Sequence, residues 1–185
     1  MPQSLQSNLT QSVTRAEFSA LVVTLFEAVN GDITGRVEFV DTPNDLNVEK
    51  AAYIGVVTGV GDNRFNPNEI LTREQAAVIL SRLSVVFELD IDIPEWIFEV
   101  LYDIESISPW ALESVLKVYR LGAITHVDIL YEGLTIRETR QTEEGAMSQL
   151  AGGFQFVFAP HEPITREQSI YAVNLLYKIT TNVYE

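Results

Sequence analysis

Apolar residues recur at helical spacing in three stretches of the chain, and the first of these shows the pattern most fully. Its apolar positions are Phe18, Leu21, Val22, Leu25, Phe26 and Val29. Recurrence at intervals of three and four residues is typical of one face of an amphipathic helix. The pair Asn30-Gly31 follows, and such a pair commonly ends a helix. The pattern therefore predicts a helix from about residue 15 to about residue 30.

All three stretches begin with an aliphatic residue and a Thr-Arg pair. The pairs are Thr14-Arg15, Thr72-Arg73 and Thr165-Arg166, and the residues three positions after each Thr are Glu17, Gln75 and Gln168. A Thr at the N-cap with Glu or Gln at N3 forms a capping box, because each side chain bonds the backbone N–H at the other position. Three capped helices are therefore predicted, and loss of one cap is expected to cost about 1 kcal/mol.

The repetition extends upstream of the second and third pairs. A Phe-x-Pro motif stands seven residues before each Thr, at Phe65 and at Phe158. Further back, helical stretches are predicted at 47–59 and 113–125, and Ser108-Pro109 fits the N-cap and first position of the latter. Short extended segments are expected before them, at 37–41 and 99–106.

These repeats predict the organisation of the chain. We expect a partial first module at 12–36, a second module at 37–88, an acidic linker at 89–98 and a third module at 99–180, with an insertion at about 127–152. The first module keeps only its capped helix. Apolar and polar residues alternate within the insertion, which favours a β-hairpin around Glu132 and Gly133.

Composition narrows the classes of function. The 185 residues include 46% hydrophobic residues and carry a formal net charge of -14. Such a chain is expected to form a packed core with a solvated acidic surface. The charge disfavours nucleic acid and polybasic membrane contacts, because both require clustered Lys and Arg. We predict no membrane insertion, because the sequence contains no long apolar run. The absence of cysteine excludes disulfides and thiolate metal sites.

Catalytic and metal-binding patterns are weak. The two histidines, His126 and His161, stand in no triad or metal-ligand spacing. Asp90 and Asp92 lack the oxygen-ligand spacing of a calcium loop. We therefore predict no catalytic residues, no metal site and no cofactor.

Taken together, the motifs resemble the S-layer homology family. The matching segments are Phe39-Val40-Asp41, Gly55-Val56-Val57-Thr58-Gly59, Phe65-Asn66-Pro67, Trp110-Ala111 and the three Thr-Arg pairs. The resemblance covers most of residues 12–180. It implies a mainly α fold, in which tandem helical modules pack around a pseudo-threefold axis.

The resemblance also implies a function and a set of site residues. Members of this family attach proteins to the bacterial cell surface, so an extracellular location at the cell wall is expected. Their ligand is a secondary cell-wall polysaccharide, often pyruvylated, or a related peptidoglycan-associated polymer, bound without covalent chemistry in grooves between modules. Carried over to this sequence, the ligand-binding residues are Arg15, Arg73, Arg166, Trp110 and Gly59.

A physical argument supports the three arginines as anion ligands. A helix N-terminus carries partial positive charge, and an Arg there adds a planar fork suited to a carboxylate. The helix dipole disfavours a cation at this position, so local structure gives the Arg no evident role. An alternative is that each Arg pairs with an acidic residue of a neighbouring module. Likewise, Trp110 is either a stacking face for a sugar ring or part of the core.

Three hypotheses of function follow. The first is a non-catalytic anchor that binds an anionic cell-wall polysaccharide. The second is an interaction or assembly module that has lost sugar binding and contacts a protein partner, with the insertion as one candidate surface. The third is an accessory domain of a larger exported protein.

Overall fold

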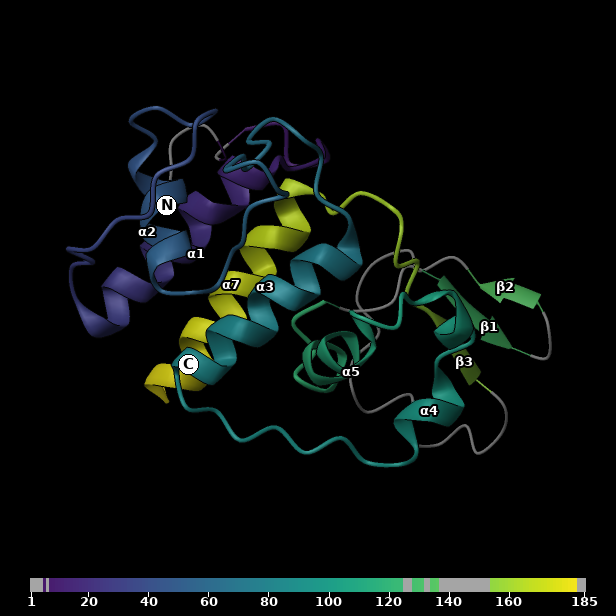
Figure 1. Ribbon diagram of the computed structural model, residues 1–185. Coiled ribbons are helices and arrows are strands. Elements are labelled where there is room, and N and C mark those ends of the chain that lie inside the picture. The colour runs from purple at the N-terminus through teal and green to yellow at the C-terminus, as the bar shows by residue number, and fades with distance from the viewer. Residues whose placement is uncertain (1–4, 6, 125–127, 132–133, 137–153, 183–185) are drawn as a thin grey trace.

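A computed structural model describes residues 5, 7–124, 128–131, 134–136 and 154–182 (Figure 1). Within these residues the chain is mainly helical, which confirms the predicted fold class at that level. The helices are α1 (Arg15–Asn30), α2 (Leu46–Tyr53), α3 (Arg73–Val86), α4 (Ile97–Val100), α5 (Leu112–Arg120) and α7 (Arg166–Thr181), with a 3₁₀ turn η2 (Ile104–Ser106). The strands are β1 (Asp128–Tyr131), β2 (Leu134–Ile136) and β3 (Phe154–Val157).

The three long helices α1, α3 and α7 each begin with a capping box. The Thr hydroxyl accepts from the N3 backbone N–H at 3.2 Å in α1 and at 3.3 Å in α3 and α7. The N3 side chain returns a bond to the N–H of the Thr at 3.0–3.1 Å. These bonds satisfy donors that a helix start would otherwise leave without partners.

Backbone hydrogen bonds join the three helix starts in a closed cycle. Val13 donates to the carbonyl of Ile164 at 3.0 Å, Leu71 to that of Val13 at 2.9 Å, and Ile164 to that of Leu71 at 3.1 Å. The first N–H of each helix forms a second cycle in the opposite direction, with the donor and acceptor pairs Arg15 to Glu69, Arg73 to Glu162 and Arg166 to Gln11, each at 2.9 Å. Each Thr-Arg pair with its flanking segments is called a copy below. Equivalent residues of the three copies therefore occupy equivalent positions at this end of the molecule.

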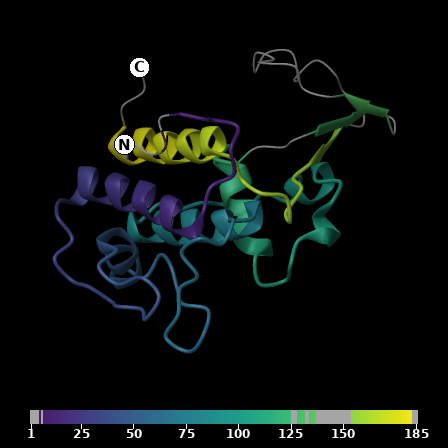
Figure 2. The ribbon, with the colours of Figure 1, turned by 90° about the horizontal axis from the view of Figure 1, so that it is seen from above.

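Shorter helices cover two of the long ones. Helix α2 packs on α1, and α5 packs on α3, while α7 lies alongside α1 (Figures 1 and 2). Asp45 caps α2 by accepting from the N–H groups of Asn47 and Val48, both at 3.2 Å. Each of these shorter helices thus packs against the long helix that precedes it in the chain.

Three local expectations were wrong. The helices predicted at 47–59 and 113–125 end earlier, at Tyr53 and Arg120. Helix α5 begins at Leu112 with Ala111 as N-cap, not at Pro109, because the Ser108 hydroxyl bonds the Glu74 carboxylate at 3.0 Å and does not cap the helix. The segment 99–106, expected to be extended, contains the end of α4 and the η2 turn.

The three strands form one antiparallel sheet in the order β2-β1-β3. Strands β1 and β2 lie within the predicted insertion and pair as a hairpin, with Tyr131 opposite Leu134. Glu132 and Gly133 lie outside the described residues. Pairing of β3 with β1 was not anticipated, and it places the sheet at one side of the molecule, away from α1 and α7 (Figures 1 and 2).

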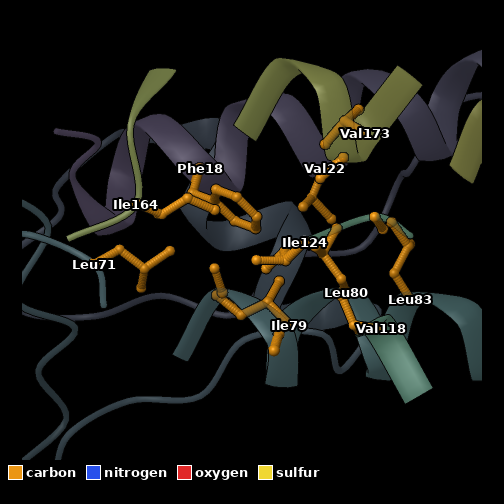
Figure 3. Packing of buried hydrophobic residues seen from close by; sticks show 14 of the residues in the cluster. Phe18, Val22, Leu71, Ile79, Leu80, Leu83, Val118, Ile124, Ile164 and Val173 are labelled. Atoms are coloured by element: carbon orange, nitrogen blue, oxygen red, sulfur yellow. The ribbon is translucent and has the colours of Figure 1, made fainter. Parts of the chain in front are cut away.

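Within the described residues, an apolar core joins the three long helices. Phe18 and Val22 from α1 meet Leu80 and Leu83 from α3 and Val173 from α7 (Figure 3). Full burial of one such side chain contributes about 1.5–3 kcal/mol. The aliphatic residues that precede each Thr, Val13, Leu71 and Ile164, are all 0% exposed. Their burial explains why that position is aliphatic in every copy.

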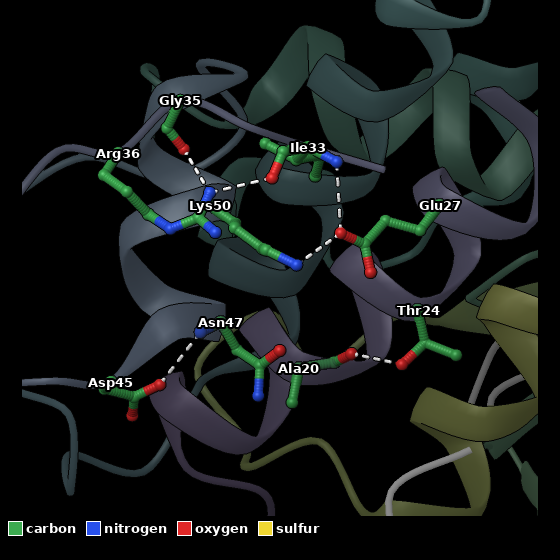
Figure 4. A network of polar contacts seen from close by, with 9 residues as sticks. All are labelled: Ala20, Thr24, Glu27, Ile33, Gly35, Arg36, Asp45, Asn47 and Lys50. Atoms are coloured by element: carbon green, nitrogen blue, oxygen red, sulfur yellow. Dashed lines mark hydrogen bonds and ion pairs between the residues drawn. The ribbon is translucent and has the colours of Figure 1, made fainter. Parts of the chain in front are cut away.

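A polar network fixes the end of α1 to α2. The Glu27 carboxylate accepts from the Lys50 ammonium and from the Ile33 N–H, the latter at 3.1 Å (Figure 4). Arg36 donates to the carbonyls of Ile33 and Gly35 at 2.8 and 2.6 Å. The hydrogen bond from Lys50 lowers the pKa of Glu27 below its ordinary value.

Candidate functional site

A groove of about 230 Å³ lies where the start of α1 meets α3 and the loop after α2. It is lined by Arg15, Val57, Thr58, Gly59, Val60, Gln75, Val78, Ile79, Arg82 and Trp110. Three of the five predicted ligand residues, Arg15, Gly59 and Trp110, are therefore brought together. The described residues that line this groove include two arginines and no acidic side chain, although the whole chain is strongly acidic.

Arg15 forms one wall of the groove and is held by backbone carbonyls. Its Nε donates to the Phe65 carbonyl at 2.9 Å and its Nη2 donates to the Thr58 carbonyl at 3.0 Å. The guanidinium lies 4.5 Å from the centroid of the Phe65 ring, which is within cation–π range. Partial burial lowers the pKa of Arg15, while Glu69 and Asp41 act in the opposite direction. Among contacts with the described residues, its Nη1 makes no hydrogen bond, so donor capacity remains.

Trp110 stands in the turn before α5 with 60% of its surface exposed. The alternative that it belongs to the core therefore does not describe this structure. Its turn is positioned by Glu74 in the first turn of α3, whose carboxylate accepts from the N–H and the hydroxyl of Ser108, both at 3.0 Å. The indole is thus an exposed apolar surface at the groove, fixed to the same helix that supplies Gln75.

Packing alone requires a glycine at position 59, whether or not a ligand binds. A Cβ at this position would lie 2.8 Å from the Arg64 carbonyl and 2.8 Å from the Phe39 ring. Any larger residue would displace backbone, because real Cβ atoms do not approach so closely. The absence of a side chain also leaves bare main chain in this part of the groove wall.

Arg82 is a groove residue that the sequence analysis missed. Its Nη1 lies 3.5 Å from the Val56 carbonyl, which is at the outer limit of a hydrogen bond. Gln75, Val78, Ile79 and Arg82 are spaced at i, i+3, i+4 and i+7, so they share one face of α3. That spacing was present in the sequence, but it identifies Arg82 only after Gln75 is known to face a groove.

Arg73, the second predicted ligand, is an interior residue with 1% exposure. Its Nε donates to the Phe158 carbonyl at 2.7 Å, and its guanidinium lies 5.0 Å from the Phe158 ring centroid. Burial lowers its pKa to about 10, with Asp103 acting in the opposite direction. The group remains charged at neutral pH and joins α3 to the loop of the third copy.

Arg166 is also buried, at 8% exposure, and its charge is already paired. Its Nη2 donates to Oε1 of Glu17 at 2.7 Å and its Nη1 donates to the Ser7 carbonyl at 3.0 Å. The alternative in which an Arg pairs with an acid of another copy therefore describes this residue. In the loop that accepts from Arg166, Ser7 stands at the position of Phe65 and Phe158 in the other copies. This loop therefore places no aromatic ring against the Arg166 guanidinium.

The three arginines share a structural role that sequence reasoning did not recognise. Each donates to the carbonyl seven residues before the Thr of the next copy, and the acceptors are Phe65, Phe158 and Ser7. The expectation that the Arg lacks a structural role was therefore wrong. The first copy also contains such a loop, at residues 7–11. Its signal in the sequence was Asn8, which stands at the same distance before Thr14 as Asn66 does before Thr72, and both residues have a positive φ.

Two aspartates hold the loops that receive the arginines. Asp41 accepts from the N–H groups of Phe65 and Asn66, both at 2.8 Å. Asp103 accepts from Phe158 and Ala159 at 2.8 and 2.7 Å. Desolvation acts to raise the pKa of Asp41, but the backbone hydrogen bonds outweigh it and the pKa is lowered. These carboxylates therefore cap the turns of the two loops.

The described residues contain neither a metal-binding cluster nor a helix that could span a membrane. That part of the chain contains no group of three or more His, Asp or Glu side chains arranged to hold a metal ion. None of its helices combines the length and apolar character needed to cross a bilayer.

Comparison with known proteins matches residues 46–77 to the S-layer homology domain. The chain is 33% identical over 180 residues to "Endoglucanase" of Bacillus sp. (strain KSM-635), an alignment covering 95% of this chain and 16% of that protein. It is 35% identical over 126 residues to "Exoglucanase XynX" of Acetivibrio thermocellus, covering 62% of this chain and 10% of that protein. The chain thus spans less than a fifth of the length of either relative. The family match includes the groove residues 57–60 and Gln75, and it supports the interpretation that this region is an S-layer homology domain.

Proposed function

We propose that this chain is a non-catalytic anchoring unit that binds an anionic secondary cell-wall polysaccharide through the groove of Arg15 and Trp110. The match to the S-layer homology domain supports attachment to the bacterial cell surface at the coarser level. The groove itself is the observation that carries the finer proposal. It combines two arginines with an exposed indole and contains no acidic side chain among its described lining residues.

The chemistry of the groove fits a carboxylate-bearing sugar, such as a pyruvylated one. A charge-assisted hydrogen bond from Arg15 contributes about 1.5–3 kcal/mol. The acidic surface repels a polyanion only over about one Debye length, roughly 8 Å at physiological salt, so local guanidinium groups dominate at contact. The apolar face of a sugar ring has a flat partner in Trp110.

The same proposal concerns the arrangement of the copies. We infer that three S-layer homology modules, the first incomplete, pack around a pseudo-threefold axis. The cyclic hydrogen bonds among Val13, Leu71 and Ile164 support this arrangement. In this proposal only the junction of Arg15 forms an open groove, whereas Arg73 and Arg166 are interior contacts.

Co-sedimentation with purified Gram-positive cell walls tests this function. The wild-type chain is expected to bind walls that retain their secondary polymer and to lose binding after that polymer is removed. Arg15→Ala is expected to weaken binding about 10- to 100-fold, as loss of one charge-assisted bond implies. Trp110→Ala is expected to weaken it without changing stability, because the indole is exposed.

Arg120→Ala is the matched control, since Arg120 is an exposed arginine on α5 that does not line the groove. Equal binding to stripped walls would contradict the assignment of the polymer as ligand. Unchanged binding by both Arg15→Ala and Trp110→Ala would contradict the assignment of the groove.

A second candidate is a protein-interaction module, favoured by an apolar groove of about 220 Å³ between α1 and α7. It is lined by Leu21, Thr24, Leu25, Ala28, Ile170, Val173, Asn174 and Tyr177. This candidate predicts no wall binding and a protein complex that Tyr177→Glu disrupts, because Tyr177 lines this groove and is exposed. Because both relatives are much longer and are named as glucanases, we also propose that the chain serves as an accessory domain of a larger protein.

A further inference from the structure

At two of the three capped helices, the residue at position N3 lies beside the arginine of another copy. Glu17, at N3 of α1, binds the guanidinium of Arg166 at 2.7 Å. Gln75, at N3 of α3, lines the groove together with Arg15. The two junctions are built from equivalent positions, so they differ chemically by a carboxylate in one and an amide in the other.

The capping bonds fix which atom of each side chain faces its arginine. Oε2 of Glu17 accepts from the Thr14 N–H at 3.0 Å, which leaves Oε1 for Arg166. Oε1 of Gln75 accepts from the Thr72 N–H at 3.1 Å. The amide nitrogen of Gln75 therefore takes the place of the free carboxylate oxygen of Glu17. An acceptor in the first junction is replaced by a donor in the second.

We propose that the neutral amide of Gln75 makes the Arg15 groove selective for an anionic ligand, whereas the carboxylate of Glu17 closes the Arg166 junction by occupying its arginine. This inference rests on the proposed function and identifies Gln75 as the residue that sets the charge preference of the groove. Gln75, Arg15 and Arg82 together present hydrogen-bond donors, and none of the described residues that line the groove is a carboxylate that would compete with a ligand.

A Gln at N3 is not sufficient to leave the neighbouring arginine open. Gln168 is the N3 residue of α7, and Arg73, which donates to the loop before that helix, is only 1% exposed. Two conditions must therefore coincide, namely a neutral N3 residue and an arginine that reaches the surface. Among the described residues, only the junction of Arg15 meets both.

The substitution Gln75→Glu tests this inference with little change in shape. A Glu retains the capping box, as Glu17 shows, so the fold is expected to persist. The introduced carboxylate is expected to pair with Arg15 and weaken binding to polymer-bearing walls at least about 10-fold. Gln168→Glu is the matched control, because it makes the same change outside the groove, and its wall binding is expected to equal that of wild type.

An NMR pH titration of the introduced carboxyl gives a second readout that needs no ligand. Its pKa is expected to lie below that of the same carboxyl in the Arg15→Ala, Gln75→Glu double variant, because a nearby guanidinium favours the ionised form while the capping bond is common to both. Equal pKa values in the two variants would overturn the inference, since residue 75 would then not face Arg15.

The two proposals fail in distinguishable ways. If Gln75→Glu binds walls as wild type does while Trp110→Ala does not, the role of Gln75 is overturned and the groove assignment stands. If the wild-type chain binds no walls, the proposed function fails and with it the role of Gln75 in selecting a wall ligand; the titration then decides only the contact with Arg15.

Discussion

Arg15 and Arg73 occupy the same place in two copies of one motif, yet one borders a groove and the other lies in the interior. Both donate Nε to the carbonyl of a Phe and both lie over that Phe ring. They differ in their surroundings, because Arg73 is enclosed beside the third copy whereas Arg15 faces the loop after α2 and Trp110. The motif therefore sets the contact with the Phe, and the neighbouring segments determine whether the arginine also borders a groove.

The largest difference between these two arginines is expected in stability. Arg73→Ala leaves a buried carbonyl without its donor and a cavity, and we expect it to lower the free energy of unfolding by about 3–5 kcal/mol. Arg15→Ala is expected to cost about 1–2 kcal/mol, because water reaches the carbonyls it leaves. Urea denaturation of both variants measures the difference. Equal losses would contradict this expectation and show that the two arginines contribute equally to stability.

The junction of Arg166 is expected to respond to loss of its carboxylate. Glu17→Gln removes the partner of a guanidinium that is 8% exposed. We expect a loss of about 1–3 kcal/mol in the free energy of unfolding, reduced from the value for a fully buried pair because Glu17 is partly exposed. Calorimetric or denaturant unfolding provides the measurement. A neutral effect would mean that the amide serves Arg166 as well as the carboxylate does.

A smaller effect is expected from the caps, and it should not depend on the copy. Thr14→Ala and Thr72→Ala each remove one hydroxyl acceptor from the first turn of a helix, at a cost of about 1 kcal/mol. The two variants should unfold at similar denaturant concentrations if capping is independent of the groove. If Thr72→Ala lowered the free energy of unfolding much more than Thr14→Ala does, the α3 cap would contribute to stability beyond its capping bond.

The smallest expected effect concerns pH. The hydrogen bond from Lys50 lowers the pKa of Glu27, so its contribution to stability is present above the unfolded-state pKa of about 4.3 and is lost as pH falls through the folded-state value. Glu27→Gln is expected to cost less than about 1 kcal/mol at pH 7, as partly exposed ion pairs do. Denaturation between about pH 5 and pH 3 should show a shallower loss of stability than in wild type. If Glu27→Gln left the dependence of the free energy of unfolding on pH unchanged, Glu27 would not contribute to the loss of stability in acid.

Sequence reasoning was most successful where a feature is local. Capping boxes depend on side chains three residues apart, so Thr14 with Glu17 and its two equivalents were visible in the pattern of the chain. The i, i+3, i+4 spacing of Phe18, Leu21 and Val22 likewise predicted a core-facing helix. The start of α5 was misplaced because the partner of Ser108 is Glu74, which is distant in sequence.

The candidate site was less predictable because it depends on which segments enclose each arginine. Nothing within the Thr-Arg motif distinguishes Arg15 from Arg73, since their exposure is set by loops about 40 to 85 residues away. Pairing of Arg166 with Glu17 spans 149 positions and requires the first and third copies to meet. The participation of Ser7 was also missed, because its copy lacks the Phe that marks this loop elsewhere.

The central claim is that the groove of Arg15 and Trp110 binds an anionic wall polymer, and NMR mapping with polymer released from walls tests it most directly. We expect the shift changes to cluster at Thr58, Gly59, Gln75 and the Trp110 indole, and to disappear in Arg15→Ala. Changes confined to the α1–α7 groove around Val173, or a map unaltered by Arg15→Ala, would contradict the claim.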